Sequence, residues 1–582
     1  MLKFIKFQLF ITLFLCLSAT IFAQTQTAES FFEQGMKLVR EEKYEQALEA
    51  FRQSVKINPK LHEAHANIGS VLMVLKRPAE SAKSFGEAVK LAPTNAGYRA
   101  SFCQSLFFAG QKTEALPQCE EAVRLDENSP LARFGLLTVM MNVGKSDGDI
   151  LTRLESALEK FPENEQILNL AAEFYLENEN LSQALFYSEK LAQIDPKDVF
   201  YQVRLANIYL RLERDSDAIA AANKALELDP KEPMAHYFLG RVYFELGLYE
   251  EATAAFQKTI EFNTNFSDVF YYLGISEKRR GKSENAIAAL RKAIVLKPDN
   301  FTYQMELGDI FSEAGKNNEA VAVYQKAVTL KPKDFMAKVG LGLSLSETGN
   351  YEEALPYLME ADKMRPGNDI VQMFLNVTRA RQQGVAQIPQ MKQYAKENPQ
   401  DINIRVRLVQ LLGYSGRMSE TAPYIEEIWK LQPKDVRVHQ TIGVVYITAG
   451  NFEKALEVYQ KAAAIEENPG TYMGLADIYT RSGKIEEAIN AYKKVIELKP
   501  DSPNIIKIYA DLLRDNNKKR EALEMYKRSL SILPLNPPAL FDAAVLSIRF
   551  GDKDSARQYL ATLKSLDPQL ARSLERFLRL KN

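Results

Sequence analysis

The residues of this chain that could carry out metal or acid–base chemistry are few and widely spaced. It has four histidines in 582 residues. His62 and His65 flank an acidic residue, but a zinc-binding helix needs histidines four residues apart, and these are three apart. The other two, His236 and His439, are far from this pair in the sequence. We therefore predict no metal site and no cofactor.

Two Gly-Lys-Ser triplets are similar to the end of a phosphate-binding loop. They are Gly144-Lys145-Ser146 and Gly281-Lys282-Ser283. That loop needs a glycine five residues before its second glycine, where this chain has Val139 and Ser276. Both triplets are typical of turns between helices. Since no other catalytic motif occurs either, we expect no catalytic residues and a protein that is not an enzyme.

The elements that make up the chain repeat with a fixed period. The stretches 231–264 and 265–298 match at an offset of 34, so that Gly240 corresponds to Gly274 and Ala252 to Ala286. A period of this length indicates one supersecondary unit repeated in tandem. Prolines that recur at the same interval divide residues 26–568 into 16 such units.

Each unit has the pattern of two amphipathic helices. In 434–467, apolar residues recur at helical spacing, Gly450-Asn451 interrupts them, and the pattern restarts at Phe452. The proline at the end of most units cannot lie inside a helix, so it closes the second helix. A glycine in the first helix and an alanine in the second would let the two backbones approach closely. We expect an aromatic residue or leucine, such as Phe256, to fill the gap between units.

These residues resemble the tetratricopeptide repeat family. Leu239-Gly240-x-x-Tyr243 is followed by Ala252 and Phe256, and Ile442-Gly443-x-x-Tyr446 recurs in register. The resemblance implies an all-α fold, a right-handed superhelical α-solenoid of about 16 helix-turn-helix repeats. It also implies that the first helices line a concave groove that binds peptides or proteins.

The units between 367 and 433 depart from the pattern. Leu375 stands where glycine or alanine is expected, and Gln387 and Thr421 stand where alanine is expected. We interpret 24–366 as an N-terminal array, 367–433 as a bend and 434–568 as a C-terminal array. The alternative is that the divergent units pack normally.

The two ends of the chain differ from the repeats. Residues 569–582 form an amphipathic basic segment, which we interpret as a capping helix; a membrane-surface or partner helix is the alternative. Residues 1–23 carry Lys3 and Lys6 before an apolar stretch, and Ala23 offers a small residue for cleavage. This is typical of a secretory signal peptide. We therefore expect a bacterial periplasmic or secreted protein, with an uncleaved membrane anchor as the alternative.

Two cysteines remain after the predicted signal peptide. Cys103 occupies the small-residue position of a first helix, and Cys119 the aromatic position of the second helix in the same unit. Because these helices are antiparallel neighbours, a disulfide can form between them; two buried thiols are the alternative.

The groove positions in 231–298 are the richest in aromatic and basic side chains, a composition typical of binding hot spots. By resemblance, the groove is lined by the second, fifth, ninth, twelfth and thirteenth positions of each first helix. We predict that a peptide or protein segment, acidic in part, binds at Met234, Tyr237, Arg241, Phe244, Tyr271, Lys278 and Arg279. The alternative is that Tyr237 and Tyr271 pack together and the charges are solvated.

The charge balance limits the kind of partner. With 74 basic and 75 acidic residues the net charge is -1, so nothing favours nucleic acid or an anionic membrane. The sequence thus predicts a non-enzymatic scaffold for protein partners of unknown identity. Alternatives are a partner-recognition subunit of an enzyme complex, such as a glycosyltransferase or exopolysaccharide export machinery, and a self-associating spacer.

Overall fold

A computed structural model describes residues 27–580 of the chain. Every regular element in this range is a helix, and no strand occurs within it. Helices α2 to α33 form 16 consecutive pairs, and α34 follows them. The predicted all-α repeat array is confirmed. The chain divides into two compact units, residues 1–212 and 213–582, here called the N-terminal and C-terminal units.

Within its described residues, the N-terminal unit consists of eleven helices. They are α2 (Ala28–Arg40), α3 (Tyr44–Ile57), α4 (His62–Val74), α5 (Pro78–Leu91), α6 (Ala96–Phe108), α7 (Lys112–Leu125), α8 (Pro130–Asn142), α9 (Asp147–Lys160), α10 (Glu165–Glu177), α11 (Leu181–Ile194) and α12 (Val199–Arg211).

The C-terminal unit contains the remaining helices. They are α13 (Asp215–Leu228), α14 (Pro233–Glu245), α15 (Tyr249–Phe262), α16 (Ser267–Arg279), α17 (Ser283–Leu296), α18 (Phe301–Glu313), α19 (Asn317–Leu330), α20 (Phe335–Glu347), α21 (Tyr351–Met364), α22 (Asp369–Ala386), α23 (Ile388–Glu397), α24 (Ile402–Tyr414), the 3-10 helix η1 (Met418–Glu420), α25 (Ala422–Leu431), α26 (Val436–Thr448), α27 (Phe452–Ile465), α28 (Pro469–Arg481), α29 (Ile485–Leu498), α30 (Pro503–Asp515), α31 (Lys519–Ile532), α32 (Pro537–Arg549), α33 (Lys553–Leu566) and α34 (Pro568–Leu580).

Capping residues and glycines fix where the helices of a pair begin and end. The side chains of Asn300 and Asp334, which precede α18 and α20, accept hydrogen bonds from the third backbone N–H that follows, at 3.1 and 2.9 Å. Such caps satisfy amide groups that have no partner inside the helix. The turn between the two helices of a pair commonly contains a residue with positive φ, such as Gly247 at +73°.

The helices of a pair pack most closely where an aromatic ring or leucine covers a glycine. A Cβ atom added to Gly240 would lie 2.5 Å from the ring of Phe256, and one added to Gly308 would lie 2.6 Å from Tyr324. The ring therefore packs inside its own pair, which the sequence prediction missed. It also reaches the next unit as predicted, because a Cβ added to Gly340 would lie 2.6 Å from Tyr324.

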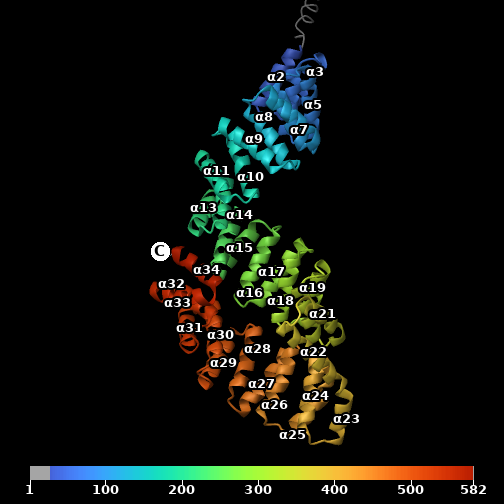
Figure 1. Ribbon diagram of the computed structural model, residues 1–582, viewed down its shortest axis with the longest axis vertical. Helices are drawn as coiled ribbons and strands as arrows, with labels where there is room; N and C mark the ends of the chain where they lie inside the picture. The colour runs from blue at the N-terminus through green and yellow to red at the C-terminus, as the bar shows by residue number, and fades with distance from the viewer. Residues whose placement is uncertain (1–26, 581–582) are drawn as a thin grey trace, which may run out of the picture. The chain divides into compact units, whose positions relative to one another are not determined.

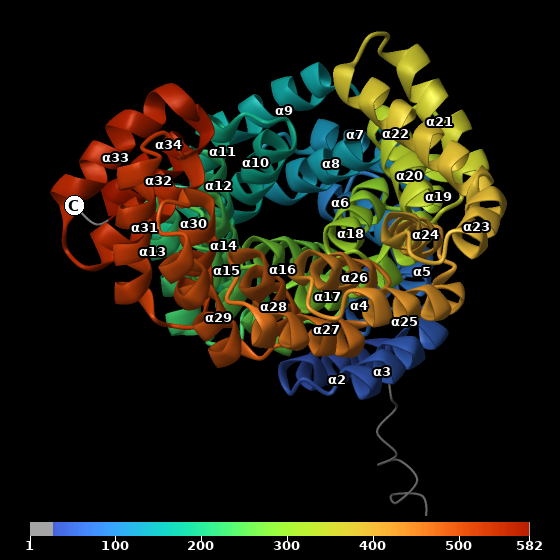
Figure 2. The ribbon, with the colours of Figure 1, turned by 90° about the horizontal axis from the view of Figure 1, so that it is seen from below.

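The C-terminal unit folds back on itself. Figure 1 shows its helices running from α14 to α22 and returning through α26 to α34 beside α13–α15. We call α13–α21 the first arm and α24–α34 the second arm. In the first arm the even-numbered helices α14 to α20 lie on the inner side of the curve (Figure 2).

Turns between paired helices of the first arm meet the second arm in reverse order along the chain. Gly349 approaches the backbone of Ser415, because an added Cβ would lie 3.0 Å from its Cα. The carbonyl oxygen of Ala314 accepts a hydrogen bond of 3.1 Å from Arg481. Gly247 packs against the ring of Phe541, where an added Cβ would lie 2.6 Å from Cζ. The two arms are therefore antiparallel.

Residues 367–433, where the sequence predicted a bend, stand between regular pairs of the two arms. Helix α22 has 18 residues instead of the usual 13, α23 and α25 have 10 each, and η1 precedes α25. The predicted register in α22 is wrong by one position. This helix begins at Asp369, so its eighth position, the usual glycine position, holds Asn376, and Leu375 occupies the preceding leucine position.

Helix α34 packs on α32 and α33 through Leu574, Phe577 and Leu578, which are buried. It also reaches α13, where Arg576 donates hydrogen bonds of 2.7 and 2.5 Å to the two carboxylate oxygens of Asp215. The predicted signal peptide lies outside the described residues. Among residues 27–580, no helix has the length and apolar character needed to cross a membrane.

Candidate interaction surfaces

The aromatic centre of the predicted groove site lies in the core between repeats. Tyr237 is only 6% exposed, and its ring centroid is 4.6 Å from that of Phe266 and 6.2 Å from that of Tyr272. Burial raises the pKa of its hydroxyl. Tyr237 is therefore a packing residue and not an exposed anchor, because neighbouring aromatic residues fill the space above the groove position.

Arg241, four residues later in α14, is held by the same cluster. Its guanidinium carbon lies 4.2 Å from the ring centroid of Tyr272. One Nη atom donates to the Tyr237 hydroxyl at 3.2 Å, and the other to Glu245 at 3.3 Å. A cation between an aromatic face and a carboxylate in its own helix has little remaining capacity for an acidic ligand.

The remaining predicted site residues are distributed over different environments. Tyr271 stacks on Tyr303, with ring centroids 5.2 Å apart, and not on Tyr237. The alternative prediction, that Tyr237 and Tyr271 pack together, is therefore also wrong. Burial raises the pKa of Tyr271 to about 12. Lys278 forms an ion pair with Glu313 at 3.0 Å.

Three further residues of the predicted site keep part of their surface. Met234 and Phe244 are half-buried on α14, and Phe244 packs edge-on against Tyr249 at 5.7 Å. Arg279 is exposed and faces a pocket between the two arms. The structure therefore does not gather the seven predicted residues into one open site.

An open apolar surface occurs at the same helix positions in α20 and α22. Ile370, Met373 and Val377 are the second, fifth and ninth residues of α22, and they are 60%, 52% and 42% exposed. Met336, the second residue of α20, is 57% exposed. We call these four residues the open groove. The sequence analysis missed it because it treated 367–433 as divergent units and sought aromatic and basic side chains. The capping Asn368 directly before the helix would have placed these groove positions.

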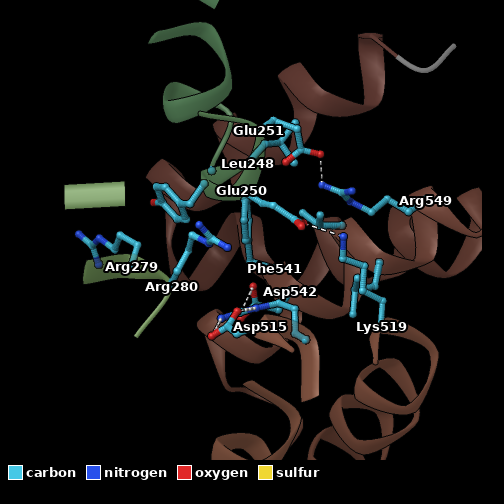
Figure 3. A pocket seen from close by; sticks show the side chains of 15 residues that line it. Leu248, Glu250, Glu251, Arg279, Arg280, Asp515, Lys519, Phe541, Asp542 and Arg549 are labelled. Carbon is cyan, nitrogen blue, oxygen red and sulfur yellow. Dashed lines mark hydrogen bonds and ion pairs between the residues drawn. The ribbon is translucent and has the colours of Figure 1, made fainter. Parts of the chain in front are cut away.

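In helix α32 of the second arm the corresponding positions are filled by the chain itself. Phe541, Val545 and Arg549 are the fifth, ninth and thirteenth residues of α32. They border a small cavity of about 70 Å³ together with the turn 247–251 of the first arm. Figure 3 shows this turn above the ring of Phe541. We call this contact the filled groove.

Two ion pairs fix the acidic end of the turn in the filled groove. Lys519 donates to Glu250 at 2.6 Å, and Arg549 pairs with Glu251. Burial acts to raise the pKa of Glu250, but the hydrogen bond from Lys519 and the charges of Lys519, Arg549 and Arg280 together outweigh it and hold this pKa below its ordinary value. Leu248 is 5% exposed, so the turn contributes both an apolar and an acidic contact.

The floor of the filled groove is charged as well. Arg514 pairs with Asp542 at 2.8 Å and with Asp515 at 2.9 Å. Burial raises the pKa of both carboxyl groups, and Arg514 opposes this. A buried cation held by two carboxylates is a structural network, and it positions α30 against α32.

The two cysteines predicted to form a disulfide are neighbours in the N-terminal unit. Cys103 in α6 and Cys119 in α7 have Cα atoms 5.3 Å apart and sulfur atoms in bonding position. This Cα separation suits a disulfide. Its formation in the protein stays a prediction. Within residues 27–580, no group of three or more metal-binding side chains comes together.

Sequence models of known families match most of the repeat array. Two tetratricopeptide repeat models match residues 32–96, 271–335 and 311–369, and residues 446–512 and 513–576. The model "Anaphase-promoting complex, cyclosome, subunit 3" matches 154–259. The chain therefore contains tetratricopeptide repeats. No curated protein matches the sequence.

Several solved structures are similar over part or most of the chain. "YrrB: a TPR protein with an unusual peptide-binding site" is 24% identical, and the match covers 32% of this chain and 96% of that one, with a TM-score of 0.31. The MamA protein is 25% identical over 28% of this chain and 91% of its own, with a TM-score of 0.27. The Cut9-Hcn1 hetero-tetramer is 13% identical over 91% and 98%, with a TM-score of 0.37.

Proposed function

We propose that this array of tetratricopeptide repeats is a non-enzymatic scaffold that binds a peptide or protein segment in the open groove. The observation that supports this proposal most directly is that four apolar side chains are exposed at groove positions of two neighbouring repeats. Exposed apolar side chains that are contiguous on a folded protein commonly mark an interaction site. The partner would present apolar side chains to Ile370, Met373 and Val377.

The surroundings of the open groove suit a peptide ligand more than a small molecule. Met336 and Met373 have flexible, polarisable side chains that adapt to different apolar partners. Arg381, one turn beyond Val377, pairs with Glu347 of α20 and joins the two helices across the groove. We propose that the irregular helices of 367–433 both expose this surface and reverse the direction of the array.

The proposed location is the periplasm or the exterior of the cell. This rests on the composition of residues 1–23 alone, with their two lysines, apolar stretch and terminal small residue. Sequencing the N-terminus of the mature protein tests it. A chain that begins near Gln24 supports export with cleavage, and a chain that retains residue 2 contradicts it.

Site-specific photo-crosslinking tests the binding surface. A photoreactive amino acid replaces Met373 in cells, and the matched control carries it at Val295, which is 79% exposed but lies in α17, a second helix. We expect a defined crosslinked partner only at position 373. Ile370→Asp with Val377→Asp should weaken its binding by about 2 kcal/mol, or roughly 30-fold. Equal crosslinking at both positions, or binding unaffected by the two substitutions, would refute the proposal.

A further inference from the structure

We infer that the filled groove is a second peptide-binding site, specific for an acidic segment with a preceding apolar residue, and that the turn 247–251 occupies it as an internal competitor. This site is separate from the open groove and does not depend on it. The sequence of the turn, Gly-Leu-Tyr-Glu-Glu, indicates the chemistry of the external partner.

The first argument is the position of the receiving residues. Phe541, Val545 and Arg549 occupy the fifth, ninth and thirteenth positions of α32, and Arg514 and Asp515 occupy the twelfth and thirteenth of α30. In α22 the second, fifth and ninth positions are open to solvent. The second arm therefore presents to the turn the same row of positions that the open groove presents to solvent.

The second argument is that the turn is bound by side-chain chemistry suited to a peptide. Phe541 is 6% exposed and covers the backbone of Gly247, where an added Cβ would lie 2.6 Å from its ring. A glycine in this place lets the end of the aromatic ring approach the main chain closely. A ligand residue at this position must therefore be equally small.

The third argument is charge complementarity. Lys519 pairs with Glu250 at 2.6 Å and Arg549 pairs with Glu251. Arg279 and Arg280 of the first arm border the same pocket (Figure 3). Two cations of the second arm, Lys519 and Arg549, thus hold two adjacent glutamates, and this arrangement favours an acidic segment over a neutral or basic one.

The fourth argument is that the contact between the turn and the second arm leaves a buried polar atom without a hydrogen-bond partner. Glu251 uses one carboxylate oxygen to pair with Arg549, while its buried Oε2 has no hydrogen-bond partner among the described residues. Unpaired buried polar atoms cost free energy. An external segment free of the constraints of a turn could satisfy them better and displace the internal one.

Peptide binding to the full-length mature protein tests the inference. The probe is a fluorescent peptide with the sequence of residues 244–254, and the control peptide carries glutamine in place of both glutamates. In the protein, Glu250→Gln with Glu251→Gln should release the turn while Lys519 and Arg549 stay intact. We expect this variant to bind the acidic peptide about tenfold more tightly than the wild type does, because the site is no longer self-occupied.

Two further measurements decide the outcome. Adding Lys519→Gln and Arg549→Gln to the released variant should abolish binding of the acidic peptide, and the control peptide should bind neither protein well. In the wild type, hydrogen exchange at residues 247–251 should accelerate with excess acidic peptide but not with the control. Equal binding of both peptides, no gain in the released variant, or unchanged exchange in the wild type would overturn the inference. Unlike the crosslinking at Met373, this test leaves the open groove untouched.

Discussion

The open groove and the filled groove occupy equivalent positions in repeats of the same unit, yet one faces solvent and the other is packed against the chain itself. In α22, Met373 at the fifth position is 52% exposed; in α32, Phe541 at the fifth position is 6% exposed. The repeat fixes where these side chains lie on the helix. The return of the second arm alongside the first decides which of them remain available to a partner.

The largest expected effect comes from truncating the fifth-position residue in each groove. Phe541→Ala removes a buried ring from the contact between the arms, so we expect a loss of about 3 kcal/mol in the free energy of unfolding. Met373→Ala should change it by less than about 0.5 kcal/mol, because that side chain is exposed. Urea unfolding followed by the fluorescence of the single tryptophan, Trp429 of α25, measures both in the same unit.

Similar losses for Phe541→Ala and Met373→Ala would show that the two grooves do not differ energetically. A loss at Met373 alone would mean that the open groove is covered in solution.

A smaller effect should distinguish the glycine of the filled groove from one of the same conformation elsewhere. Gly247 and Gly450 both have φ of +73°, but only Gly247 has atoms near its missing side chain. Gly450→Ala should cost about 1 kcal/mol from the left-handed backbone alone. Gly247→Ala should cost about 2 kcal/mol, because the added methyl group also displaces Phe541.

Hydrogen exchange at 247–251 should accelerate in Gly247→Ala and stay unchanged in Gly450→Ala. If the two alanine variants lose the same stability and exchange alike, the contact between Phe541 and the turn contributes nothing.

The smallest expected effect concerns the ion pair between the two ends of the unit. Asp215 is 5% exposed and accepts two hydrogen bonds from Arg576 of α34. Asp215→Asn should cost about 1.5 kcal/mol, the low end for hydrogen bonds to a charged group, because the amide keeps one acceptor for the guanidinium. The matched control is Glu284→Gln, which removes the exposed partner of Lys316.

We expect the Glu284→Gln change to lie within measurement error, since exposed ion pairs contribute little. Thermal unfolding of the two variants at the same salt concentration provides the comparison. Equal melting temperatures would show that α34 is held to α32 and α33 only, and not to α13.

Prediction from the sequence worked best where one repeat is sufficient to explain the packing. The small residues Gly240 and Ala252 predicted a close pair of helices, and the structure shows this close approach, with the ring of Phe256 on that glycine. The prediction that Tyr237 and Arg241 are available to a ligand in the groove is wrong for a different reason. Composition placed aromatic and basic side chains in the groove, but whether a ring is exposed depends on Phe266 and Tyr272, which fill the space around it.

The sequence by itself determined the local structure of this protein: the helix pairs, their turns and caps, and the apolar residues between successive pairs. These features depend on residues less than about one repeat apart, so the repeating sequence pattern is sufficient to predict them. Only the tertiary structure decided the antiparallel return of the second arm, because Gly247 and Phe541 are nearly 300 residues apart and no local pattern connects them. That return leaves the groove at Met373 open and fills the groove at Phe541.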